Sequence, residues 1–211
     1  MIEDLFTTLV GSHLWHMNDE DSDRDLFRVY VASTEGILRG TVDTKSKFVQ
    51  EGDDVDIAVH EVGTVVSQLL KGNVNFLIGV MSPILVSEHK CVDSFLYDLQ
   101  AIVRRTISKN CYRSIRGLGK HNYIKYIVSG KDDSERRCNK ICRVLAFGHN
   151  LLLTGDFGFT PFTCGTPENV VELLGLLDDA YWFSSLPEKP EEEFFRDWLY
   201  QVRKYEEGLK K

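Results

Sequence analysis

Residues 11–31 read GSHLWHMNDEDSDRDLFRVYV and place an Asp-x-Asp pair, Asp23 and Asp25, at the start of an apolar run. The run LFRVYVA at residues 26–32 is rich in β-branched and aromatic residues, which is typical of a strand. Side chains two residues apart on a strand project from the same face, so we expect the two carboxylates to lie side by side. Like charges in that arrangement repel, and they are costly to desolvate unless a cation lies between them. The stretch therefore predicts a strand that begins at a cation site.

A second strand is predicted over residues 55–59, VDIAV, and it carries another acidic residue, Asp56. If the two strands are neighbours, Asp56 adds a third carboxylate. Such oxygen ligands suit Mg²⁺ or Mn²⁺, with the phosphates of a nucleotide completing the coordination. Upstream, Gly11 permits close approach of a phosphate, and Ser12 offers a hydroxyl and an N–H. The alternative interpretation is that residues 19–25 form a solvated acidic turn before a strand.

The composition indicates a folded protein. The chain has 211 residues, 43% hydrophobic and 27% charged, which is long enough for one sizeable core and outside the range of disordered chains. The five cysteines form no close-set framework, and neither a signal peptide nor a long uncharged apolar run is evident. We expect a reduced, cytoplasmic protein with no membrane partner.

The order of the patterns predicts an α/β (α+β) fold. Residues 2–10 suit a helix that ends at Gly11, whereas residues 33–54 suit a loop with a hairpin or a short strand. Residues 60–71 show helical spacing and are followed by Gly72 as a stop signal. Further helices are expected over residues 92–103 and 139–153, from Thr166 onward, and over 191–209.

Charge is distributed unevenly along the chain. Residues 1–61 contain fourteen acidic and five basic side chains, whereas the stretch from Arg104 to Lys125 contains seven Lys or Arg and no acid. One interpretation is a triphosphate clamp formed by Arg113 with Lys120 or Lys125, and another is a docking surface for an RNA backbone. A third is a solvated surface that pairs with the acidic N-terminal half. We expect Gly117 and Gly119 to break this segment.

Two motifs resemble a known enzyme superfamily. Gly11 and Ser12, followed by Ser22, Asp23 and Asp25 before an apolar strand, resemble the signature of the polymerase-beta-type nucleotidyltransferases. Residues 55–77, VDIAVHEVGTVVSQLLKGNVNFL, are similar to the predicted nucleotidyltransferases of the RNA-repair-pathway polymerase-beta family, with Asp56 on a strand and a K-G-N-x-N turn after a helix. The resemblance covers about residues 8–160. It departs at His13 and His16, where the family usually has Arg and Gly.

The resemblance implies a polymerase-beta-like palm with a mixed sheet in residues 1–90 and a mostly helical C-terminal region in residues 91–211. It also implies a magnesium-dependent nucleotidyltransferase that moves a nucleoside monophosphate from an NTP such as ATP to a hydroxyl, an RNA (tRNA-like) end in RNA repair or modification being favoured. In that scheme Asp23 and Asp25 hold the metals, Asp56 holds one of them and helps to deprotonate the acceptor, and Gly11 and Ser12 contact the outgoing phosphates. Two alternatives stay open: a protein hydroxyl as the acceptor, as in some toxin systems, or a catalytically silent nucleotide-binding module.

Overall fold

The computed structural model describes residues 3–86 and 93–208, which form two compact units. The first unit consists of Met1–Leu70, Asn75–Thr106 and Glu191–Lys211, and the second of Lys71–Val74 and Ile107–Pro190. This division differs from the boundary expected after residue 90, because α5 (Asp93–Thr106) and α9 (Glu192–Gly208) pack with the sheet of the first unit.

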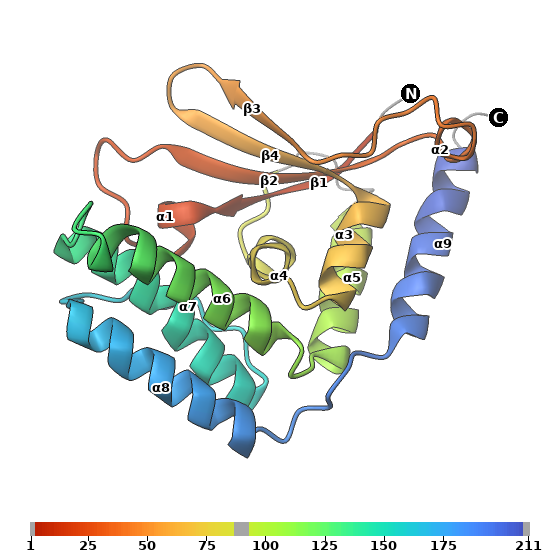
Figure 1. The fold of residues 1–211 in the computed structure, drawn as a ribbon. Helices are drawn as coiled ribbons and strands as arrows, with labels where there is room; N and C mark the ends of the chain where they lie inside the picture. Colours follow the sequence, from red (N-terminus) through yellow and green to blue (C-terminus); the bar gives the residue numbers. More distant parts are fainter. Residues whose placement is uncertain (1–2, 87–92, 209–211) are drawn as a thin grey trace. The chain divides into compact units, whose positions relative to one another are not determined.

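The sheet of the first unit has four strands, β1 (Glu3–Val10), β2 (Arg24–Val31), β3 (Lys47–Glu51) and β4 (Val55–Glu61), in the spatial order β1-β2-β4-β3 (Figure 1). β2 runs parallel to β4, whereas the pairs β1/β2 and β3/β4 are antiparallel. The mixed sheet and its surrounding helices confirm the predicted α+β class.

The prediction of a helix over residues 2–10 was wrong, because this segment forms β1. β1 pairs with β2 on one side, and on the other its Leu9 and Thr7 backbones bond to Ile84 and Val86. Residues 5–9 are all buried, so the segment lacks the alternation of a half-exposed strand. A short, continuously apolar run does not distinguish a buried strand from a helix.

Helices cover one face of the sheet. Figure 1 shows α3 (Val62–Leu70), α4 (Val74–Met81) and α5 together below the strands. Phe27 of β2 packs edge-on against Phe76, with ring centroids 5.6 Å apart, and its ring lies against the backbone of Gly79. Two short helices, α1 (Gly11–Leu14) and α2 (Thr34–Leu38), follow β1 and β2 respectively. The helical face thus contains the core that fixes the orientation of β2.

The C-terminal helix α9 is tied to the sheet by a buried ion pair. Arg203 binds Glu61, which is only 2% exposed, and donates a second hydrogen bond of 2.8 Å to the carbonyl of Ala32. Trp198 Nε1 donates to the carbonyl of Phe95 at 3.1 Å. These contacts explain why α9 belongs to the first unit.

The second unit contains α6 (Cys111–Asn122), the π-helix η1 (Tyr123–Val128), α7 (Glu135–Thr154) and α8 (Pro167–Phe183). The prediction that Gly117 and Gly119 break the basic segment was wrong, because α6 runs through both. A Cβ at Gly119 would lie 2.5 Å from Leu145 Cδ2, so this glycine lets α6 approach α7 closely. The predicted start of a helix at Thr166 is confirmed by its capping box with Asn169.

Residues 3–86 and 93–208 contain no helix whose length and apolar character would allow it to cross a membrane.

Candidate functional site

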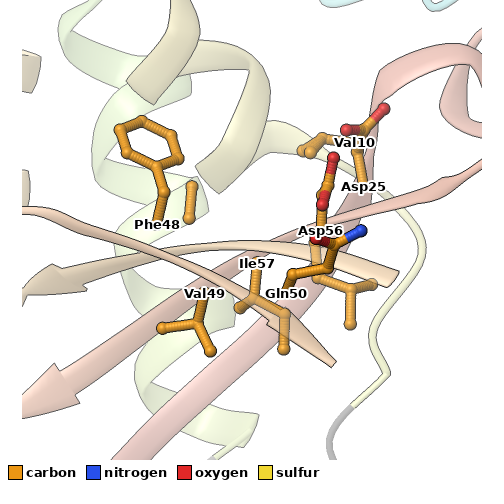
Figure 2. A pocket seen from close by; sticks show the side chains of 9 residues that line it. Val10, Asp25, Phe48, Val49, Gln50, Asp56 and Ile57 are labelled. Carbon is orange, nitrogen blue, oxygen red and sulfur yellow. The ribbon is translucent and has the colours of Figure 1, made fainter. Parts of the chain in front are cut away.

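The register of the parallel pair β2/β4 brings two predicted carboxylates together. Asp25 of β2 and Asp56 of β4 are direct Cα partners, and Val10 of β1 faces Asp25 on the other side. Figure 2 shows both carboxylates pointing to the same side of the sheet. Asp25 is half-buried and Asp56 is exposed. The second residues of two neighbouring strands thus place two negative charges side by side at one edge of the sheet.

The carboxylate pair lies in a cavity of about 460 Å³ that involves all four strands. In Figure 2 the ring of Phe48 rises on the carboxylate side of the sheet, whereas Val49 and Ile57 point to the opposite side. The residues that line the cavity are Val10, Asp25, Leu26, Phe48, Val49, Gln50, Asp56, Ile57 and Ala58. Phe48 and Gln50 were not predicted as site residues, since a short strand with one aromatic and one amide side chain carries no distinctive sequence signal.

Gly11 has a specific steric role beside Asp25. A Cβ at this position would lie 1.7 Å from Asp25 Oδ2, and the residue has a φ of +65°, which side chains disfavour. Only glycine therefore leaves room for the Asp25 carboxylate while the chain turns from β1 into α1. The predicted approach of Gly11 to a phosphate stays a prediction, whereas the structure shows that Gly11 leaves space for the Asp25 carboxylate.

Asp23 lies just before β2 and is exposed. It is not among the residues that line the cavity. Within the part of the chain that the structure describes, no three His, Cys, Asp or Glu side chains are grouped closely enough to hold a metal ion. Of the three expected carboxylates, the structure brings Asp25 and Asp56 together, and the metal-binding roles of all three stay predictions.

His13, which stands where the family usually has Arg, positions the loop in front of β2. Its Nε2 lies 3.1 Å from the carbonyl oxygen of Ser22. The loop itself is closed by Asp19 and Ser22, whose hydroxyl bonds to the Asp19 carboxylate and accepts from the Asp19 N–H at 3.0 Å. His13 thus links α1 to the residue directly before Asp23. This contact was not predicted, because nothing in the sequence pairs a histidine with a backbone carbonyl nine residues away.

His16 occupies a position with glycine-like backbone geometry. Its φ is 53°, and its side chain is exposed. The left-handed conformation of a non-glycine residue costs about 1–2 kcal/mol. The turn after α1 thus keeps the shape that a glycine would adopt, although a histidine stands there.

His60 lies further along β4 and is buried in the core, and it is not among the residues that line the cavity. Its ring packs between Phe27 and Phe76, with centroids 4.7 and 4.6 Å away, and its Nδ1 is hydrogen-bonded to Ser46 Oγ at 2.7 Å. Burial lowers the pKa of the His60 imidazole to about 4. His60 is therefore a neutral core residue.

The basic stretch lies mostly in the second unit, where part of it is neutralised. Arg116 of α6 forms a bidentate pair with Asp178 of α8, with N–O distances of 2.7 and 2.9 Å. Arg113 and Lys120 of α6 and Lys125 of η1 are exposed. Neither Arg113 nor Lys120 forms an ion pair within the described residues. Their predicted roles in nucleotide or RNA binding stay predictions.

Comparison with known protein families gives a match. Residues 2–148 match the family described as the RNA repair pathway DNA polymerase beta family. The matched residues include Asp25, Asp56, Gly11 and the whole sheet. No match was found among curated proteins.

Proposed function

The chain belongs to the RNA repair pathway DNA polymerase beta family and has a nucleotidyltransferase-like domain, and from this premise we propose that it transfers a nucleoside monophosphate from an NTP to an RNA end. The observation that carries the proposal is the register pair Asp25 and Asp56, whose carboxylates face one cavity. The RNA acceptor is supported by the family's description and by the exposed basic residues Arg113, Lys120 and Lys125.

The residues of the site fit a magnesium ion. Mg²⁺ is usually held by one or two carboxylates together with substrate phosphates and water, so the pair Asp25 and Asp56 suffices without a third protein ligand. Asp23 is the proposed additional ligand. When bound with a nucleotide, the ion would neutralise phosphate charge and favour ionisation of the attacking hydroxyl.

The chain's own residues then position the reactants. The acceptor oxygen forms a bond to the α-phosphorus, the bond from that phosphorus to the bridging oxygen breaks, and pyrophosphate leaves. We assign Asp56 as the group that takes the acceptor's proton, because it is the more exposed of the paired carboxylates. Gly11 leaves space for the Asp25 carboxylate, and Gly11 and Ser12 are the proposed contacts of the leaving phosphates. Positioning and charge neutralisation supply most of the acceleration in phosphoryl transfer.

The test is incubation of the purified protein with each α-labelled NTP, Mg²⁺ or Mn²⁺ and total RNA, followed by a denaturing gel. The parallel variants are Asp56→Asn and, as a matched control, Asp53→Asn, which changes an exposed acid outside the cavity. We expect label in RNA with the parent and the control, and none with Asp56→Asn. Label in protein alone would move the acceptor to a protein hydroxyl, and no label anywhere would contradict the proposal.

A further inference from the structure

Phe48 is a solvent-exposed aromatic side chain near the carboxylate pair. It lies on the edge strand β3 and is 85% exposed, yet it lines the same cavity as Asp25 and Asp56. We infer that the Phe48 ring is the stacking surface for the unpaired base at the end of the acceptor RNA. This inference rests on the proposed function and adds to it the requirement for a base at the acceptor end.

The register of β3 and β4 fixes where the ring lies. Gln50 is the partner of Asp56, and Phe48 is the partner of Ala58. Because residues two apart share a face, Phe48 and Gln50 stand on the same side as Asp56, as Figure 2 shows for the ring and the carboxylate. The ring is displaced from Asp56 by one strand spacing and by about 7 Å along the strand. That separation matches one nucleoside, whose base would stack on the Phe48 ring while its sugar hydroxyl lies at Asp56.

The sheet order assigns this surface to the acceptor. In the order β1-β2-β4-β3, Phe48 lies on the side of Asp56 that faces away from β2. Gly11 and Asp25, where the outgoing phosphates are proposed to lie, are on the β1/β2 side. An acceptor that approaches Asp56 from the β3 side therefore meets Phe48 first.

The neighbours of the ring favour a flat ligand. Ala58, the register partner of Phe48, has a small side chain, so the space over β4 next to the ring stays open. Gln50 adds an amide that both donates and accepts hydrogen bonds. Stacking on an aromatic side chain tolerates any base, since every base has a π-face. The ring, the small neighbour and the amide together match a nucleobase rather than an aliphatic side chain.

The experiment measures binding of a fluorescently labelled single-stranded RNA oligonucleotide by anisotropy, without NTP, and of the same oligonucleotide with an abasic 3′ end. The variants are Phe48→Ala, Phe48→Trp and, as a matched control, Phe183→Ala, which removes a ring that is 81% exposed on α8. We expect Phe48→Ala to weaken binding of the intact oligonucleotide about tenfold. Phe48→Trp should restore it, Phe183→Ala should leave it unchanged, and none of the Phe48 variants should alter binding of the abasic oligonucleotide.

Two results would overturn the inference. The first is unchanged binding by Phe48→Ala, and the second is an equal loss on the intact and abasic oligonucleotides. If binding is unchanged and the sedimentation coefficient of Phe48→Ala is lower than that of the parent, β3 is instead an interface between two copies of the chain. Since no NTP is present, the binding result is read independently of whether the parent protein transfers label, so failure of the stacking inference is distinct from failure of the proposed function.

Discussion

The two ends of strand β4 carry acidic residues in opposite situations. At the start of the strand, Asp56 is exposed and forms no ion pair with any described residue. At its end, Glu61 is 2% exposed and fully partnered. Arg203 neutralises it, the N–H of Gly63 donates to it at 2.7 Å, and the N–H of Ala32 approaches at 3.4 Å.

The difference separates a buried carboxylate that stabilises the fold from an exposed one that we propose takes part in catalysis. A buried charge is tolerated only when the protein supplies its partners, as it does for Glu61. The pair Asp25 and Asp56 instead combines two like charges at one edge of the sheet, and we propose that a cation from outside the chain relieves their repulsion. The comparison yields predictions for both ends of the strand.

The largest effect on stability is expected at the Glu61 end. Arg203→Ala leaves the Glu61 carboxylate buried without its cation, and breaking such a pair costs about 3–5 kcal/mol of unfolding free energy. Urea denaturation measures the loss. The matched control is Arg196→Ala, which removes an exposed ion pair with Glu192 on the same helix and should cost about 0.5 kcal/mol. Equal losses for the two variants would mean that burial of the pair is unimportant.

At the other end of the strand, Asp56→Asn should damage activity and spare stability. Loss of a charged group at the reacting centre is expected to lower nucleotidyl transfer about 100- to 1,000-fold. The free energy of unfolding should stay within about 0.5 kcal/mol of the parent, because the side chain is exposed. The gel assay and urea denaturation provide the two readouts. A variant that is strongly destabilised but active would reverse the roles given to the two ends.

His60, which lies between these ends on the same strand, should make the fold sensitive to acid. Its pKa is lowered to about 4 by burial, so between that value and the ordinary 6.5 the unfolded chain binds more protons than the folded one. Stability therefore falls as the pH drops, by about 2 kcal/mol between pH 7 and pH 5. Denaturation at the two pH values should show a smaller decrease for His60→Gln than for the parent. The same decrease in both proteins would assign the acid sensitivity to other groups.

Gly11→Ala tests whether the backbone at Gly11 positions the Asp25 carboxylate. The new Cβ would clash with the Asp25 carboxylate and would sit at a positive φ, which costs about 1–2 kcal/mol. We expect a stability loss of that size together with reduced nucleotidyl transfer, because Asp25 must move. Gly40→Ala, at a similar φ of +68° but with nothing nearby, is the control that separates strain from displacement. It should lose stability alone.

The smallest effect is expected at His16. Replacement by glycine removes the strain of a φ of 53° but increases the freedom of the unfolded chain, so His16→Gly should change stability by less than about 1 kcal/mol. Thermal denaturation would show a small shift in the melting temperature. A large destabilisation would show that the His16 side chain has a structural role beyond the turn.

The sequence predicted the secondary-structure elements that depend on local pattern. The strands that carry Asp25 and Asp56 are recognisable from their β-branched residues, whereas their adjacency is known only from the parallel pairing in the structure. The helix predicted at β1 was wrong because residues 5–9 are all buried, so the run lacks the alternation that marks a half-exposed strand. The continuity of α6 through Gly119 depends on its packing against Leu145, which no local rule contains.

Contacts between residues far apart in the chain could not be predicted from the sequence either, because they depend on tertiary structure. The ion pair of Glu61 joins residues 142 positions apart, and the hydrogen bond from His13 to Ser22 depends on the fold of α1 and the following loop. The register of β3 places Phe48 on the same face as Asp56, two residues further along the neighbouring strand. In each case the residue type was visible, but its partner was set by tertiary structure.

The central claim, that Asp25 and Asp56 together bind a divalent cation with a nucleotide, is tested most directly by titrating Mn²⁺ in the presence of a non-hydrolysable NTP analogue. Free Mn²⁺ is measured by electron paramagnetic resonance for the parent, for the double variant Asp25→Asn/Asp56→Asn, and for Asp53→Asn. We predict that the double variant binds Mn²⁺ at least about tenfold more weakly than the other two proteins. Equal binding by all three would contradict the claim.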